Sequence, residues 1–397
     1  MSPLFSSHPA IPIRREAERI FGLDLLRAAA ILSVVCAHGF VVLYPHFGPA
    51  LGVLGHGGFY GVELFFVLSG FLIGQLLIRK GEELRDPRQI GLFYLRRWFR
   101  TLPLFFLFLL VNVWFERQFR EHAVNPSEAL SHAFFLRNFA TLRLTFFPES
   151  WSLAVEEWFY LLFPALLWVI LRMRRRFDEA LIAAAAFFLL LSTVLRMVHA
   201  HDGGSTWTES QRMVVLLRFD ALMIGILAAW LSLRAPALWN RWRALAAVTG
   251  GLVLLAMYAT LWKIQDHQLA FGDDNYFART FRFTVVSLGF ALLLPWASTW
   301  RLEVENAGSR TIRRIALWSY ALYLVHLPFF DFVVRKIFPT TATSALRAIS
   351  CFTVELGGAI VLSALLHHFY EAPWMRLRDR RLAPTGSKQA VDKRRDR

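Results

Sequence analysis

Apolar blocks long enough to cross a lipid bilayer recur along this 397-residue chain, and they constrain its fold more than any other feature. A transmembrane helix needs about 20 consecutive, mainly apolar residues. Only helices and closed barrels satisfy the backbone in lipid, and these blocks lack the alternation of barrel strands. The chain is therefore expected to be all-α, a polytopic transmembrane helical bundle of about ten spans. The expected spans are 21–44, 59–78, 102–116, 151–171, 180–199, 213–233, 244–262, 281–298, 315–334 and 348–369.

The composition agrees with a membrane protein and excludes several other classes. Hydrophobic residues make up 56% and charged residues 18%, whereas soluble domains are about 45–50% apolar and about 25% charged. Cys36 and Cys351 both fall inside apolar blocks, so neither a disulfide framework nor a cysteine metal site is expected, and no metal is expected. The polar start, up to Arg19, has no apolar signal-peptide region, so the first helix is expected to be retained.

The basic residues predict the topology. Thirty Lys and Arg residues fall in one alternate set of connecting segments and eleven in the other, and the richer set is expected to be cytoplasmic, with both termini. This pattern accounts for the net charge of +15 without a nucleic-acid partner. The expected organisation is a cytoplasmic N-terminal segment (1–20), a transmembrane domain (21–373) and a basic cytoplasmic tail (374–397).

The first span carries ionisable residues, which are costly in a membrane and often mark a functional site. Arg27 and His38 are eleven residues apart, so they share a helix face about 16 Å apart along the axis. His38 is then in the outer half, and Asp24 can pair with Arg27. The alternative is a snorkelling arginine and a histidine that only bonds a neighbouring helix.

Two further spans carry polar groups. Glu156 in the fourth span is expected at the same depth as His38, which makes the two a candidate general-base unit. Glu149 and Glu157 fit an interfacial position instead. In the ninth span, Ser319, Tyr323 and His326 form one polar stripe, either functional or for packing. Weaker signals, which are equally compatible with a structural role, come from Arg218 and Asp220.

An arginine cluster precedes the third span. Arg97 and Arg100 share a helix face, and Arg96 lies beside them, among aromatic residues. Guanidinium groups bind phosphates bidentately and aromatic rings stack on bases, so a ligand with several phosphates, such as coenzyme A, would fit. The alternative is a topology anchor or a site for lipid headgroups.

Six motifs, in order over residues 22–373, resemble the acyltransferase 3 family of membrane-bound O-acyltransferases. In that family's pattern Glu63 replaces a usual aspartate, which keeps the charge on a longer side chain. The motifs are Arg27 with His38, residues 61–73 including Ser69, Arg96 to Pro103, residues 151–160 including Trp151, Ser152 and Glu156, residues 319–328, and Tyr370 to Pro373.

The resemblance implies transfer of an acyl group, usually acetyl, from cytoplasmic acyl-CoA to a hydroxyl. It implies a multi-pass protein of the bacterial inner membrane, whose acceptors are sugars of lipopolysaccharide, exopolysaccharide or other exported glycans. Acyl-CoA is then a co-substrate, no cofactor is permanently bound, and the lipid bilayer is the remaining partner. The alternative function is a transporter or flippase for a lipid-linked sugar, without acyl-transfer chemistry.

Site residues follow from the same motifs. His38 is expected to take the acceptor's proton and Glu156 to orient its imidazole; an acetyl-His38 relay is the alternative. Donor binding is assigned to Arg27, Arg96, Arg97 and Arg100. The expected supporting residues are Asp24, Glu63, Ser69, Trp151, Ser152, Ser319, Tyr323 and His326.

Overall fold

The computed structural model describes residues 20–48, 52–120, 124–173, 176–201, 211–266, 276–338 and 344–382, and within these ranges every regular element is a helix. The predicted all-α fold class is confirmed. The long helices are α1 (Phe21–Gly39), α3 (Gly52–Lys80), α4 (Pro87–Phe115), α6 (Ser150–Met173), α7 (Phe177–His201), α8 (Phe219–Arg234), α10 (Arg243–Asp266), α12 (Arg282–Thr299), α13 (Ala307–Phe332) and α14 (Ala345–Leu366).

Short helices connect or extend these spans. They are η2 (Phe40–Val42), α2 (Tyr44–Phe47), η4 (Gly81–Arg85), η5 (Glu116–Arg120), α5 (Pro126–Ala133), η7 (Val215–Leu217), α9 (Pro236–Arg241), α11 (Tyr276–Thr280), η8 (Val333–Ile337), η10 (His367–Glu371) and α15 (Ala372–Arg381).

Nine helices among the described residues are long and apolar enough to cross a membrane. The sixth predicted span, 213–233, differs from the prediction. Its first residues form the short turn η7, and α8 starts only at Phe219 and has 16 residues. The cause is that Arg218 and Asp220, both fully buried, bind partners on other helices around this turn.

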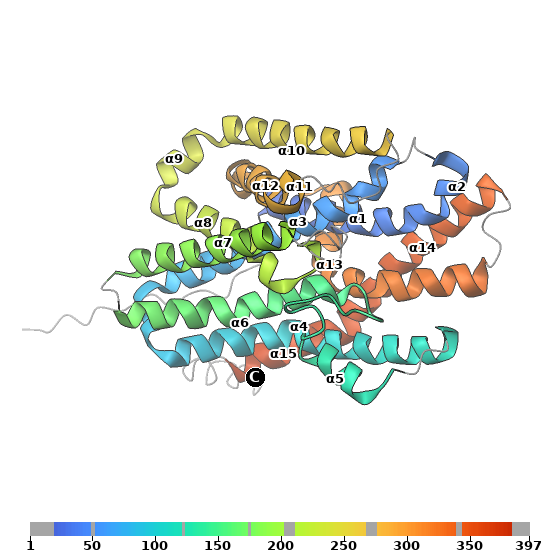
Figure 1. The fold of residues 1–397 in the computed structure, drawn as a ribbon, viewed down its shortest axis with the longest axis horizontal. Coiled ribbons are helices and arrows are strands. Elements are labelled where there is room, and N and C mark those ends of the chain that lie inside the picture. Colours follow the sequence, from blue (N-terminus) through green and yellow to red (C-terminus); the bar gives the residue numbers. More distant parts are fainter. Residues whose placement is uncertain are drawn as a thin grey trace, which may run out of the picture.

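Helix directions agree with the expected alternation of connections. The long helices run roughly side by side, with α9 at one end of the molecule and α2 at the opposite end (Figure 1). Helix α9 lies in a connection predicted to be cytoplasmic, and α2 lies in one predicted to be on the opposite side of the membrane. Residues 1–19 and 383–397, which include most of the two predicted cytoplasmic terminal segments, lie outside the described residues, so the side of the membrane on which the termini lie stays a prediction.

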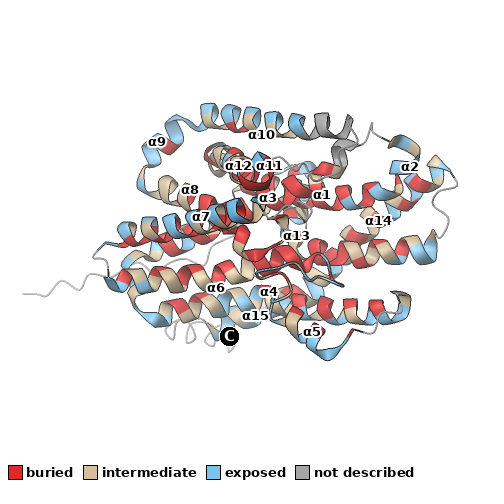
Figure 2. Ribbon diagram, viewed as in Figure 1, coloured by how far each residue is buried: buried red, intermediate tan, exposed pale blue. Residues whose placement is uncertain are grey.

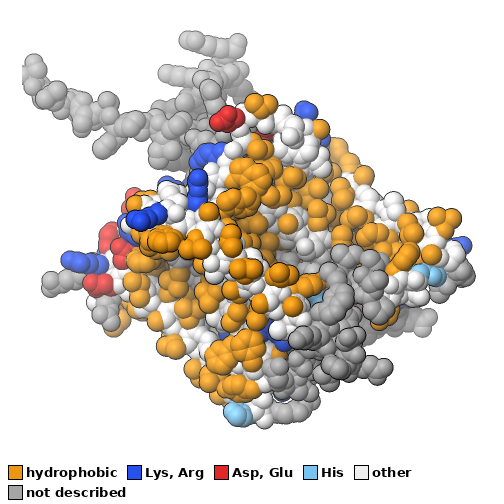
Figure 3. Space-filling model, turned by 90° about the horizontal axis from the view of Figure 1, so that it is seen from above, with side chains coloured by type: hydrophobic (Ala, Val, Ile, Leu, Met, Phe, Trp, Pro, Cys, Tyr) orange, Lys and Arg blue, Asp and Glu red, His pale blue; other side chains and the backbone are white. Residues whose placement is uncertain are grey.

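Burial increases from the edge of the bundle to its middle. Helix α10 lies at one edge and is mostly exposed, whereas α1, α3 and α13 carry many buried residues (Figure 2). Seen from above, hydrophobic side chains cover the middle of the molecule, while Lys and Arg gather towards one end (Figure 3). This surface fits a protein with lipid around its middle.

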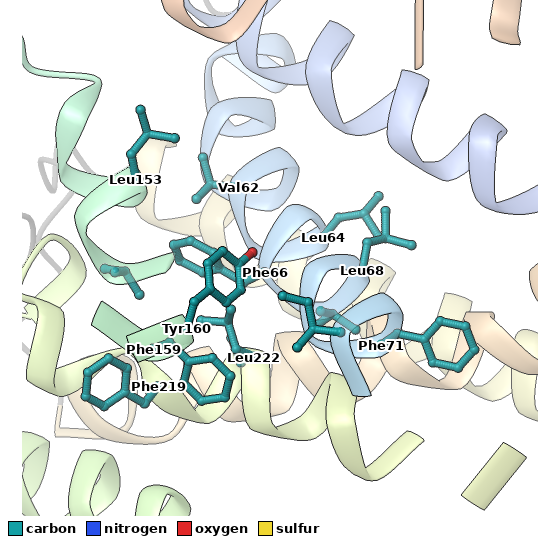
Figure 4. Close-up of a cluster of buried hydrophobic side chains, with 14 of the residues drawn as sticks. Val62, Leu64, Phe66, Leu68, Phe71, Leu153, Phe159, Tyr160, Phe219 and Leu222 are labelled. Carbon is teal, nitrogen blue, oxygen red and sulfur yellow. The ribbon is translucent and has the colours of Figure 1, made fainter. Parts of the chain in front are cut away.

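Helices α3 and α8 make the closest crossing. A glycine stands on each side of this crossing, Gly70 in α3 and Gly225 in α8. Because neither residue has a side chain, the two backbones approach each other directly. A Cβ at Gly70 would clash with the Leu222 carbonyl oxygen, and one at Gly225 with the Val67 carbonyl oxygen. Buried side chains of α3, α6 and α8 pack around the crossing, among them those labelled Val62, Phe66, Phe71, Phe159, Tyr160, Phe219 and Leu222 in Figure 4.

We expect Gly70→Ala to destabilise the protein by about 1–3 kcal/mol, because an added methyl group overpacks a closed interface. The measurement is the unfolding midpoint of purified protein in detergent. Gly91→Ala in α4 is the matched control, since its Cβ would meet open space. Equal midpoints for Gly70→Ala and Gly91→Ala would contradict the close crossing.

Candidate active site

A cavity of about 500 Å³ lies between α1, α3, α4, α6 and α13. It brings together most of the residues selected from the sequence, although these come from five separate helices. The predicted residues that line it are Asp24, Arg27, Ser69, Arg96, Arg97, Arg100, Ser152, Glu156, Ser319 and Tyr323. The predicted residues outside its lining are His38, Glu63, Trp151 and His326.

One end of the cavity is basic. Arg96 and Arg100 are exposed, and the Arg97 guanidinium lies 4.1 Å from the centre of the Tyr160 ring. All three arginines lie inside α4, which starts at Pro87 rather than at the predicted residue 102. The Asp86 carboxylate caps this helix by accepting a hydrogen bond from the Arg88 backbone N–H at 2.9 Å. The arginines are therefore held on a regular helix rather than on a loop.

Glu156 belongs to this basic end. The Ser69 and Tyr160 hydroxyls are its polar neighbours, and Arg97 and Arg100 lie within electrostatic range. It was predicted to orient His38, but the structure gives these two residues different surroundings. Helix α6 places Glu156 beside Ser69 of α3 and beside Arg97 and Arg100 of α4.

The other end of the cavity is formed by two hydroxyl groups. The Ser152 and Tyr323 hydroxyl oxygens are 2.5 Å apart, and the Tyr323 hydroxyl also donates to the Glu149 backbone carbonyl at 3.2 Å. Ser319, one turn before Tyr323, is buried in the same wall. The predicted polar stripe of α13 therefore faces the cavity at its first two positions.

The third position of that stripe contacts His38. The His326 Nε2 lies 3.0 Å from His38 Nδ1, and His326 Nδ1 lies 2.7 Å from the Tyr323 backbone oxygen. His326 is fully buried, while the His38 side chain is exposed. An exposed imidazole held by a buried one, next to the wall of a cavity, is an arrangement that can accept a proton from a bound hydroxyl.

Arg212 is a neighbour of His38 that the sequence reasoning did not select. Its guanidinium lies 5.8 Å from the Phe59 ring centre and 5.5 Å from that of Trp151, within electrostatic range of His38. Its backbone oxygen accepts a hydrogen bond from Arg218 Nη1 at 2.8 Å. A cation here attracts negative charge that develops beside His38. The sequence feature that could have indicated Arg212 is its position in an outer connection, directly before the predicted span 213–233. In the sequence analysis it contributes only to the predicted topology.

Glu63 lies in a buried ion-pair network, away from the cavity. Its carboxylate pairs with Arg218 and accepts a hydrogen bond from the Ser287 hydroxyl at 3.1 Å. Beside it, Asp220 pairs with Arg196 at 2.8 Å. All four charged side chains are fully buried, and the Glu63 pair joins α3 to Arg218, the residue that precedes α8.

The remaining residues of this region hold the start of α6. The Trp151 backbone oxygen accepts a hydrogen bond from Asn138 Nδ2 at 3.0 Å, and its ring packs edge-on against Phe66.

His132 of α5 is buried against Phe146. Burial and the nearby positive Arg137 lower the pKa of His132 to about 4, so the ring is neutral at neutral pH. Among the described residues, no group of three or more His, Cys, Asp or Glu side chains could hold a metal ion.

Comparisons with known proteins cover most of the chain. The acyltransferase 3 family model, described as an acyltransferase domain, matches residues 20–366. The chain is 25% identical to peptidoglycan O-acetyltransferase OatA of Listeria monocytogenes, over 88% of the chain and 55% of that protein. It is 29% identical to the putative peptidoglycan O-acetyltransferase YrhL of Bacillus subtilis, over 77% and 48%.

A putative O-acetyltransferase of Staphylococcus aureus (strain COL) is 23% identical, over 89% of the chain and 57% of that protein. The chain thus spans about half the length of these curated relatives. No solved structure matches it.

We expect Glu63→Gln to destabilise the protein by about 3–5 kcal/mol, because it leaves the Arg218 charge buried without its carboxylate. The double variant Glu63→Gln with Arg218→Met should recover part of this loss, since it removes both charges. Unfolding midpoints of the two variants in detergent make the comparison. If the double variant loses as much stability as the two single variants together, Glu63 and Arg218 act independently, which would contradict the pairing.

Proposed function

Because this chain belongs to the acyltransferase 3 family, we propose that it is a membrane O-acyltransferase acting on a glycan. It moves an acyl group, acetyl in particular, from cytoplasmic acyl-CoA to a hydroxyl of a cell-surface or exported glycan. The observation that carries this proposal is the cavity itself: it runs from the arginines of α4 to the Ser152–Tyr323 pair, one turn of α13 from the two histidines.

The donor assignment rests on charge and shape. Coenzyme A carries its phosphates on a nucleotide at one end of a long, narrow arm that ends in the thiol. Arg96 and Arg100 are exposed at the basic end of the cavity. Guanidinium groups bind phosphate through paired hydrogen bonds. Arg27 lines the same space from α1. The phosphates then bind at the inner end, and the thioester reaches towards Tyr323.

The acceptor assignment rests on the relatives. Two of them are named for O-acetylation of peptidoglycan, one of these as putative. Peptidoglycan is therefore the first acceptor to test, ahead of the lipopolysaccharide and exopolysaccharide sugars expected from the family resemblance. The exposed side chain of His38 gives an acceptor hydroxyl access to a base without entry through the donor end.

The reaction needs one base and one leaving group. His38 accepts the proton of the acceptor hydroxyl, and the oxygen attacks the thioester carbonyl carbon. The tetrahedral intermediate collapses as the carbon–sulfur bond breaks, and the thiolate of coenzyme A takes up the proton from His38. The products are an O-acyl glycan and free coenzyme A thiol. The Arg212 charge favours negative charge on the intermediate.

The direct test uses purified protein in lipid nanodiscs with acetyl-CoA and peptidoglycan fragments. Free thiol should appear only when protein and acceptor are both present, and mass spectrometry should find an acetylated sugar. Transport of a lipid-linked sugar without thiol release would support the flippase alternative instead.

We expect His38→Ala to abolish transfer while leaving acetyl-CoA binding unchanged, because the side chain lies outside the cavity lining. The unfolding midpoint should fall only slightly, since the buried His326 loses one hydrogen-bond donor. General bases contribute typically 10²–10⁴-fold, so the loss should be on the order of 100-fold or more. Wild-type turnover in this variant would exclude His38 as the base.

Arg100→Ala and Arg97→Ala should mainly raise the apparent KM for acetyl-CoA. Loss of a charge-assisted hydrogen bond costs about 1.5–3 kcal/mol, or roughly 10- to 150-fold in affinity. Arg88→Ala is the matched control, an exposed arginine of the same helix outside the cavity lining. Normal acetyl-CoA binding combined with poor membrane insertion would instead identify the cluster as a topology anchor.

A further inference from the structure

The two contacts of His326 determine which of its ring nitrogens carries hydrogen. Its Nδ1 lies 2.7 Å from the Tyr323 backbone oxygen. A carbonyl oxygen can only accept a hydrogen bond, so Nδ1 of His326 must be the N–H donor.

The neutral form of His326 follows from its burial. The ring is fully buried, and its two hydrogen-bond partners, a backbone carbonyl and a second imidazole, carry no negative charge. A charged imidazole there would lose hydration without a counter-charge at contact distance. With hydrogen on Nδ1, the Nε2 of neutral His326 has only a lone pair and accepts.

His38 is thereby assigned as well. Its Nδ1 lies 3.0 Å from the accepting Nε2 of His326, so this Nδ1 must donate. The Val34 backbone carbonyl, one turn earlier in α1, is a further acceptor near the His38 ring. The hydrogen of neutral His38 is therefore on Nδ1, and its Nε2 carries the lone pair.

We propose that His326 is the positioning residue of the active site, which holds His38 in the tautomer whose Nε2 acts as the base. The inference rests on the proposed acyl transfer and deepens it. His326 then has the orienting role that the sequence had assigned to Glu156. A carboxylate has this role in serine-protease triads, where it holds the histidine through Nδ1.

The two hydrogen bonds, from His38 to His326 and from His326 to the Tyr323 carbonyl, also determine where the proton goes. The hydrogen on His326 is held by the Tyr323 carbonyl, and the hydrogen on His38 Nδ1 is held by His326. Neither acceptor can pass a proton onwards without creating a buried imidazolium or a protonated carbonyl. The proton that His38 Nε2 takes from the acceptor hydroxyl must therefore leave from the same nitrogen, to the departing thiolate. While His38 is charged, its hydrogen bond to His326 becomes charge-assisted and stronger.

A pair of amide substitutions separates orientation from packing. His326→Gln places an amide oxygen where Nε2 was and keeps an acceptor for His38. His326→Asn keeps a donor for the Tyr323 carbonyl but is too short to reach His38. We expect His326→Asn and His326→Ala to lower kcat by at least about tenfold with little change in the KM for acetyl-CoA, because the groups that orient metal-bound histidines in the same way contribute about 10- to 100-fold.

His326→Gln should recover most of the lost kcat. The matched control is His199→Asn, a histidine whose ring bonds the Leu195 carbonyl of its own helix. Equal kcat for His326→Gln and His326→Asn, whether both high or both low with normal stability, would overturn the positioning role.

A spectroscopic measurement keeps the proposal testable even where a variant fails to fold. Solid-state NMR of ¹⁵N-histidine-labelled wild type distinguishes protonated from unprotonated ring nitrogens, and comparison with His38→Ala identifies the His38 signals among twelve histidines. We expect an unprotonated Nε2 on neutral His38. An unprotonated Nδ1 would overturn the inference. If the tautomer is as expected but acetyl-CoA is never consumed, the proposed function fails and the assignment of the pair stands.

Discussion

The low dielectric of the bilayer is the constraint on which this structure depends. A charge inside the membrane must be paired, because its lost hydration is otherwise not recovered. The chain meets this demand behind the cavity, where Glu63 pairs with Arg218 and Asp220 with Arg196. These pairs join α3, α7 and α8 at the place where α3 and α8 cross on glycines. The wall of the cavity that α3 forms is thereby fixed from behind.

The charges of the cavity itself are arranged differently. Arg96 and Arg100 are exposed, whereas the paired arginines behind the wall are buried. In the proposed function the donor's phosphates supply the missing negative charge, so donor binding and charge neutralisation are one event. Farther along the cavity the polar groups are the hydroxyls of Ser152, Ser319 and Tyr323, and the two histidines lie beyond this wall. In the proposed function, donor binding and proton transfer are thus separated in space. The phosphates bind at the charged end of the cavity, and the proton is taken up by His38, beyond the wall at its other end.

The sequence predicted the helices well, and ten of the fourteen residues selected from it line one cavity, for a physical reason. Apolar runs report helices directly, and spacing along a helix places Arg97 with Arg100, or Ser319 with Tyr323, on one face. The partner of His38 could not be found in this way. Spacing gives the depth of a residue, but not the direction in which its helix faces. Glu156 was matched to His38 by depth, yet α6 places it beside the arginines.

The position of Arg212 near His38 and the start of α8 could not be predicted from the sequence, for a related reason. The segment before α8 has no helical period, and its course is set by contacts with Asn138 and Arg218, which are far away in sequence or inside the membrane. Such contacts leave no pattern in a single sequence. His326 was selected as a polar residue of a stripe, but its contact with His38 depends on how α1 and α13 pack.

In the proposed function, donor and acceptor reach the site from opposite sides of the membrane. Sealed vesicles of both orientations, containing the full chain and given radiolabelled acetyl-CoA from outside, test it most directly. Inside-out vesicles, whose cytoplasmic face is outside, should transfer label to a glycan trapped in the lumen, and right-side-out vesicles should not. Equal transfer in both orientations, or transfer only in right-side-out vesicles, would contradict the account.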